Sequence, residues 1–176
     1  LECTLLVLSL MSVLWLVSVF LKNASIVDPA WSLLFLVIAF YCAHTTGWTP
    51  GKTLLFAMVA LWALRLSAHL FFRGLGKPED ARYTAFRKQF GPERYWWVSF
   101  FQVFVLQGVL ALLISAPLQL ACTVDSPDPI STLDLIGTVV FILGFGTEAI
   151  ADWQLRCFRN NPENRDRLLD TGLWRY

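Results

Sequence analysis

Four charged residues near the end of the sequence have the spacing of a ligand site. They are separated by four, four and three residues, so a helix places them along one face: Glu148, Asp152, Arg156 and Arg159. Carboxylates accept hydrogen bonds from ribose hydroxyls or an amide, and guanidinium groups bind phosphates. Glu148 and Asp152 are like charges one turn apart, which favours a ligand between them. The alternative is a helix that becomes polar where it leaves a membrane.

A positive track runs along an earlier apolar segment. Arg65, His69 and Arg73 follow one another at intervals of four residues, so they share a helix face. Arg65 lies about eight residues inside the segment, too deep to reach the surface easily, and an ionisable group at such depth is costly. This depth favours a functional role for Arg65. Arg73 also suits an anchor at a helix end, and His69 also suits a satisfied core group.

Asp28 precedes Pro29 at the start of another apolar segment. An aspartate before a proline is typical of a helix N-cap followed by the first helical residue. The functional alternative is a carboxylate at the mouth of an active site. No metal site is predicted, because the four cysteines are far apart in sequence; we expect unpaired, packed thiols.

The composition indicates an integral membrane protein. The 176 residues are 56% apolar with a mean hydropathy of +0.56, and only 15% are charged, against about 25% in soluble domains. Spans of about 20 apolar residues predict helices, because lipid cannot satisfy an open strand edge. We therefore predict an all-α, polytopic helical bundle. Its five expected spans are 3–21, 30–44, 53–72, 98–121 and 133–150.

The basic residues predict the orientation of this bundle. Most of the 14 Lys and Arg residues fall in segments 22–29, 73–97 and 151–176, which are therefore predicted to be cytoplasmic. Segment 73–97 is predicted to form an amphipathic helix on the membrane surface, or alternatively a lid over a cofactor site. The net charge of +1 gives no indication of a nucleic-acid partner.

The whole chain, residues 1–176, is expected to be one transmembrane domain. It starts without Met inside an apolar run, and segment 151–176 looks unfinished, so we expect a fragment cut at both ends. The expected location is the endoplasmic reticulum in a eukaryote or the inner membrane in a bacterium. The expected partners are membrane lipids and a lipid-like small molecule, and the oligomeric state is left open.

Six stretches, in this order, resemble a group of membrane proteins related to the C-terminal domain of steroid 5-alpha-reductases. They are Ser25–Trp31, Leu61–Leu66 with Arg73 following, Pro78–Tyr83, Gln107–Gly108, Glu148–Gln154 and Thr171–Tyr176. The resemblance implies about seven helices in the full protein, with NADPH entering from the cytosol. It also implies reduction of a carbon–carbon double bond conjugated to a carbonyl in a lipid.

The resemblance also implies roles for individual residues. The charged stripe would be half of a dinucleotide site, and the residues that would hold the cofactor are Asp152, Arg156, Arg159, Arg65, Arg73, Arg175 and Tyr176, beside Glu148. Where steroid reductases carry a tyrosine, this chain has Trp62, which cannot donate a proton as an acid. The expected acid is Asp28 acting through water, or a residue beyond the sequence.

Two other functions fit the same residues. One is a membrane methyltransferase that uses S-adenosylmethionine, because isoprenylcysteine methyltransferases have a similar helical architecture. S-adenosylmethionine carries no phosphate, so the arginines at 65, 73, 156 and 159 favour NADPH. The other is a helical membrane protein without catalytic activity, in which replacing Asp152 or Arg159 would change stability at most.

Overall fold

The computed structural model describes residues 2–123, 130–164 and 167–175, and within these ranges every regular element is a helix. The predicted all-α class is confirmed. Five helical segments are long and apolar enough to cross a membrane, as predicted. They are Glu2–Leu21, Ala24–Thr46, Pro50–Gly74, Pro92–Ile114 and Thr132–Asn160. The chain divides into two compact units, Leu1–Pro129 and Ile130–Tyr176, and each is described by itself.

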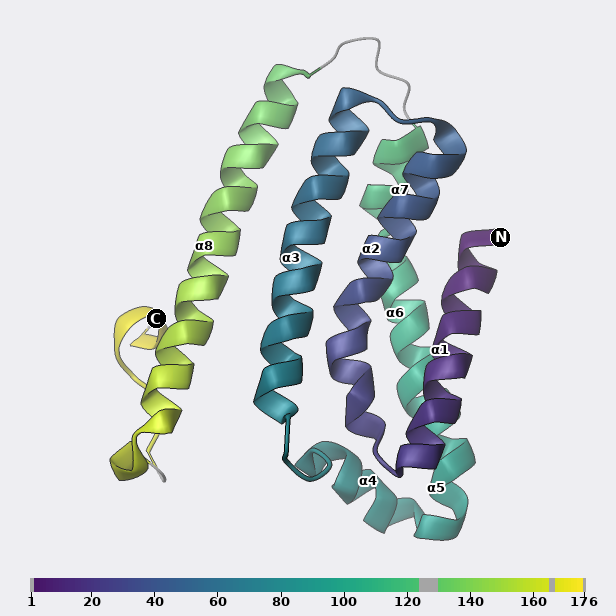
Figure 1. Ribbon diagram of the computed structural model, residues 1–176, viewed down its shortest axis with the longest axis vertical. Helices are drawn as coiled ribbons and strands as arrows, with labels where there is room; N and C mark the ends of the chain where they lie inside the picture. Colours follow the sequence, from purple (N-terminus) through teal and green to yellow (C-terminus); the bar gives the residue numbers. More distant parts are fainter. Residues whose placement is uncertain (1, 124–129, 165–166, 176) are drawn as a thin grey trace. The chain divides into compact units, whose positions relative to one another are not determined.

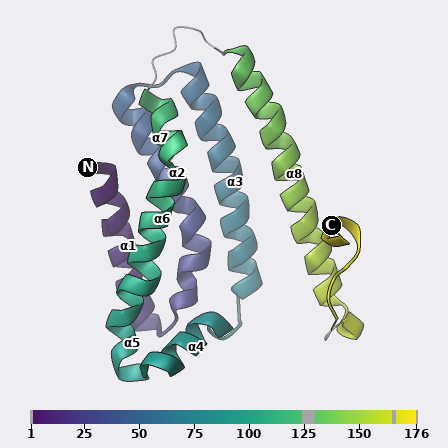
Figure 2. The ribbon, with the colours of Figure 1, turned by 180° about the vertical axis from the view of Figure 1, so that it is seen from behind.

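The first unit is a bundle of long helices (Figures 1 and 2). Its elements are α1 (Glu2–Leu21), η1 (Ala24–Ile26), α2 (Val27–Thr46), α3 (Pro50–Gly74), α4 (Ala81–Phe90), α5 (Pro92–Ser99), the π-helical turn η2 (Phe100–Val105), α6 (Leu106–Ile114) and α7 (Ala116–Thr123). The expected span 98–121 therefore begins earlier, at Pro92, and its helix is interrupted at Ser115.

Apolar side chains pack at the centre of this bundle. Val7 and Met11 of α1, Ile38 of α2 and Phe104 of η2 are all at most 1% exposed. Gly108 of α6 faces α1, since a Cβ atom there would lie 3.2 Å from Cγ of Met11. Close approach of two helices at a glycine is typical of packing inside membranes. Many large apolar side chains elsewhere are exposed, as expected for a surface that faces lipid.

Helix α4 crosses the end of the bundle where α1 gives way to α2 (Figure 1). Asp80 caps α4 by accepting a hydrogen bond from the backbone N–H of Arg82. The helix ends at Phe90 because Gly91 adopts a φ of 81°, and Pro92 then begins α5. Tyr83 of α4 is buried, whereas Phe90, at the end of the same helix, is exposed.

The second unit contains one long helix and a short returning segment. Its elements are α8 (Thr132–Asn160), η3 (Pro162–Asn164) and η4 (Gly172–Arg175). A capping box between Ser131 and Asp134 begins α8. The returning segment is held to α8 by two hydrogen bonds, because the backbone N–H of Leu173 donates to Oε1 of Gln154 and the indole N–H of Trp174 donates to the carbonyl of Ala151, each at 3.0 Å.

Candidate functional site

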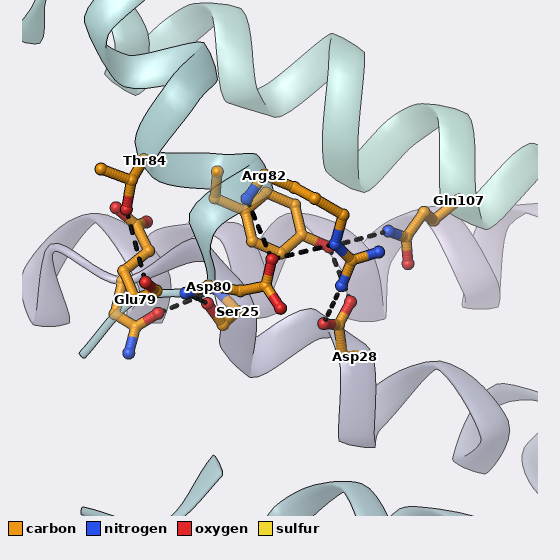
Figure 3. Close-up of polar contacts among 9 residues, drawn as sticks. Ser25, Asp28, Glu79, Asp80, Arg82, Thr84 and Gln107 are labelled. Carbon is orange, nitrogen blue, oxygen red and sulfur yellow. Dashed lines mark hydrogen bonds and ion pairs between the residues drawn. The ribbon is translucent and has the colours of Figure 1, made fainter. Parts of the chain in front are cut away.

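Asp28 takes part in a polar cluster beneath α4. The interpretation of Asp28 as a helix N-cap is wrong, because α2 begins one residue earlier and Ile26 occupies the cap position. The Asp28 carboxylate instead accepts hydrogen bonds from Nη2 of Arg82 at 2.8 Å and from the hydroxyl of Tyr83 at 2.6 Å. Figure 3 shows Asp28, Arg82 and Gln107 converging from α2, α4 and α6. The functional alternative, a carboxylate at the mouth of an active site, stays a prediction.

Tyr83 lies at the centre of this cluster. Its side chain is 4% exposed, and its hydroxyl also accepts a weak hydrogen bond from Nε2 of Gln107 at 3.5 Å. Burial raises the pKa of Tyr83, and the hydrogen bond to the Asp28 carboxylate raises it further. Tyr83 therefore keeps its proton and donates it to Asp28 in a hydrogen bond.

A second ion pair joins α4 to the α1–α2 connection. Arg87 grips Glu79 with two nitrogens, Nε at 3.0 Å and Nη2 at 2.9 Å, and the same carboxylate accepts the backbone N–H of Ala24 at 2.8 Å. The Glu79 side chain is only 12% exposed. The hydrogen bonds that Arg87 donates to Glu79 are the main cause that raises the pKa of Arg87. These contacts bind segment 79–87 firmly to the start of α2.

Asp80 reinforces the same junction. Its backbone N–H donates to the hydroxyl of Ser25 at 2.7 Å, and its carboxylate accepts Nε of Arg82 at 3.0 Å (Figure 3). The hydrogen bonds from Arg82 lower the pKa of Asp80. Arg82 therefore bridges two carboxylates, those of Asp28 and Asp80. This bridge holds the guanidinium group in one orientation.

Tryptophans connect the cluster to the middle of the bundle. The indole N–H of Trp31 donates to the carbonyl of Gln107 at 3.2 Å. The Trp31 ring contacts Phe35 edge-on, and Phe35 contacts Trp62 in the same way, with centroids 4.9 and 5.5 Å apart. Three of the stretches that carry the resemblance, 25–31, 78–83 and 107–108, therefore meet at one end of the first unit.

The second unit carries the predicted charged stripe. All four of its residues lie on α8, with Glu148 and Asp152 partly buried and Arg156 and Arg159 exposed. Arg175 belongs to η4, which is hydrogen-bonded to α8 at Ala151 and Gln154, beside Asp152. The fold thus returns the segment that contains Arg175 to α8, although 19 residues separate the bonded partners Gln154 and Leu173. Tyr176, the other predicted residue of this segment, lies outside the described residues.

The predicted positive track lies on α3, in the first unit. Arg65 and His69 are partly buried, and Arg73, in the last turn, is exposed. Because the two units are described separately, a cofactor site that combines α3 with α8 stays a prediction. Within the described residues, no group of His, Cys, Asp and Glu side chains could hold a metal ion, and the four cysteines are free.

A family model described as protein of unknown function (DUF1295) matches residues 14–176. The chain belongs to this family. No curated protein and no solved structure gives a significant match to it. The DUF1295 description names no reaction, so the activity has to be argued from the residues.

Sequence reasoning singled out Asp28 in this DUF1295 chain but not the other side chains of the polar contacts around α4, which are Glu79, Arg82, Tyr83, Arg87 and Gln107. The available signal was charge. Glu79 and Arg82 lie in the same long polar segment as Tyr83, and Asp28 is an acid at the start of an apolar span. Gln107 stands in an otherwise apolar run, where a lone amide indicates a buried polar contact.

Proposed function

We propose that this protein is a membrane-embedded, NADPH-dependent reductase of a carbon–carbon double bond conjugated to a carbonyl in a lipid. The observation that carries the proposal is the return of η4 onto α8. It brings the segment that contains Arg175 back to α8, the helix whose charged stripe contains two carboxylates and two arginines. Phosphates require several cations and ribose hydroxyls require acceptors, and this set of side chains supplies both.

The residues proposed to hold the cofactor would contact different chemical groups of it. Arg156, Arg159 and Arg175 would bind phosphates, while Glu148 and Asp152 would accept hydrogen bonds from hydroxyl or amide groups. Arg65 and Arg73 of α3 are proposed to add cations, and Tyr176 is retained from the resemblance. The exposure of Arg156 and Arg159 supports this assignment, because a guanidinium group that binds a soluble cofactor must be accessible.

Reduction of the double bond adds one hydride and one proton. NADPH supplies the hydride when it is bound, so the chain must supply or conduct the proton. Asp28 stays the proposed acid, acting through water as expected from the sequence, and its contacts with Arg82 and Tyr83 would hold the carboxylate in place.

The test is NADPH binding to the purified full-length protein in detergent. Binding is read as energy transfer from tryptophan to the nicotinamide, since Trp153 and Trp174 lie on α8 and η4. We expect saturable binding that Arg159→Ala weakens by about tenfold or more, because one charge-assisted contact is lost. Asp152→Ala should also weaken it. Arg94→Ala, at an exposed arginine on α5, is the matched control and should leave the affinity unchanged.

A parallel calorimetric titration with S-adenosylmethionine separates the alternatives. If S-adenosylmethionine binds and NADPH does not, the stripe would belong to a methyltransferase. If neither compound binds, α8 is only the polar end of a membrane helix and the proposal fails. Equal weakening by Arg94→Ala and Arg159→Ala would remove Arg159 from the site.

A further inference from the structure

A cavity of about 480 Å³ lies in the first unit, where α1 ends and α5 begins. Its lining includes two cations, Lys22 and Arg87, and three hydroxyl groups, those of Ser18, Tyr95 and Ser99. No carboxylate is among the described residues that line it. A cavity with this lining fits an anion that also accepts hydrogen bonds.

The hydroxyl of Tyr95 points to a ligand. The side chain is 1% exposed, and among the described residues its buried hydroxyl has no hydrogen-bond partner. Buried polar groups are nearly always hydrogen-bonded, so a partner from outside the protein is indicated. Ser18 and Ser99 differ, because their hydroxyls already donate to the carbonyls of Trp15 and Trp96. The donors left for a ligand are therefore Tyr95 and the two cations.

The charge balance favours a ligand with a single negative charge. The guanidinium group of Arg87 lies over the Tyr95 ring, 4.5 Å from the ring centroid. Arg87 also forms an ion pair with Glu79, which is not part of the described cavity lining. Glu79 thus offsets one of the two positive charges, and Lys22 leaves a net excess of about one. A phosphodiester carries one negative charge at neutral pH, which matches this excess better than the dianion of a phosphate monoester.

The position of the cavity favours a lipid as the source of that phosphodiester. Two candidate spans meet there, one ending at Leu21 and the other beginning at Pro92, which is the depth of lipid headgroups. Trp96, which is part of the lining, is 52% exposed, and Phe20 in the last turn of α1 is 84% exposed. We propose that this cavity binds the phosphodiester of a glycerophospholipid through Lys22, Arg87 and Tyr95, with the acyl chains along the apolar surface of α1.

Native mass spectrometry of the full-length protein in detergent tests this site. The probes are dioleoylphosphatidylglycerol, dioleoylglycerol, which has the same chains without phosphate, and inorganic phosphate as a competitor. The variants are Tyr95→Phe and Lys22→Gln. Their matched controls are Tyr41→Phe on α2 and Lys88→Gln on α4, two residues that are not part of the described lining. Arg87 is left intact, because its pairing with Glu79 holds the fold.

We expect phosphatidylglycerol to bind about tenfold more tightly than dioleoylglycerol, and each cavity variant to reduce that preference by about threefold or more. The controls should keep it. Equal retention of the two lipids, or cavity variants that behave like their controls, would overturn the proposal. Displacement of phosphatidylglycerol by millimolar inorganic phosphate would overturn the lipid as the ligand. Lys22→Gln changes an exposed side chain, so it remains informative if Tyr95→Phe does not fold.

Discussion

In the first unit the carboxylates of Asp28 and Glu79 form ion pairs with arginines of α4, whereas in the second unit the arginines of the α8 stripe are exposed. Glu79 and Arg87 share two hydrogen bonds with little access to water, and Asp28 is held by Arg82 and Tyr83. Arg156 and Arg159 of α8 present their guanidinium groups at the surface. Both regions contain stretches that carry the family resemblance, so resemblance alone does not separate a residue that holds the fold from one that binds a ligand. Burial and hydrogen-bond partners make that distinction.

The largest effect on stability is expected from Glu79→Ala. This change leaves Arg87 without its carboxylate and removes the acceptor of the Ala24 N–H. Loss of one partner of a largely buried pair costs about 3 kcal/mol, so the free energy of unfolding in detergent should fall by about that amount. Glu93→Ala is the control, because Glu93 is exposed on α5, and should change it by less than about 0.5 kcal/mol. Equal small effects would show that the Glu79–Arg87 pair does not hold the fold.

Much of the fold follows from sequence because its causes are local. An apolar run of sufficient length predicts a span, and Gly91-Pro92 predicts the end of α4, where Gly91 does adopt a positive φ. Asp28 shows where local reasoning fails. The pattern Asp-Pro is typical of an N-cap, but η1 already precedes α2 at this point. The Asp28 carboxylate instead accepts a hydrogen bond from Arg82, 54 residues away in the sequence. A contact of that separation leaves no periodic signal in the sequence.

The candidate site, like the fold, could be predicted only where its causes are local in the sequence. The α8 stripe could be predicted because its spacing is helical, and the helix is confirmed. The return of η4 depends on a hydrogen bond between Gln154 and the backbone of Leu173, which no spacing rule anticipates. Gly172, with its positive φ, was the available signal, since a turn with φ above zero favours glycine.

A smaller effect, with a defined pH dependence, is expected from Tyr83→Phe. Loss of the hydroxyl removes a hydrogen bond to a carboxylate, which should lower the free energy of unfolding by about 1–2 kcal/mol at pH 7. Because the folded protein raises the pKa of Tyr83, its stabilisation is complete below the ordinary tyrosine value of 10.0 and declines as the pH rises above it. The unfolding free energy of the original protein should therefore fall more steeply above pH 10 than that of the variant.

Parallel pH profiles for the two proteins would contradict this. The profile also sharpens the comparison of the two regions. If Tyr83 holds α4 in place, its ionisation must lower the free energy of unfolding. Replacing an exposed arginine of α8 should leave that free energy almost unchanged.

The smallest effect on overall stability, but an informative local one, is expected from Gly172→Ala. The new Cβ would lie 2.6 Å from Oε1 of Gln154, and the φ of 63° is unfavourable for alanine. Gln154 could move aside only by giving up its hydrogen bond to Leu173, so η4 should detach from α8. Hydrogen exchange at the Leu173 amide should become faster, while the global free energy of unfolding falls by about 1 kcal/mol or less.

Gly137→Ala is the matched control, since a Cβ there meets nothing within 4 Å and alanine favours a helix. It should leave exchange at Leu173 unchanged. If η4 delivers Arg175 to the cofactor, Gly172→Ala should also weaken NADPH binding several-fold while the first unit keeps its stability. Faster exchange with unchanged NADPH affinity would remove Arg175 from the proposed site but leave the α8 stripe in place. The charged residues of the second unit would then act without η4, and the contrast with the closed ion pairs of the first unit would rest on α8 alone.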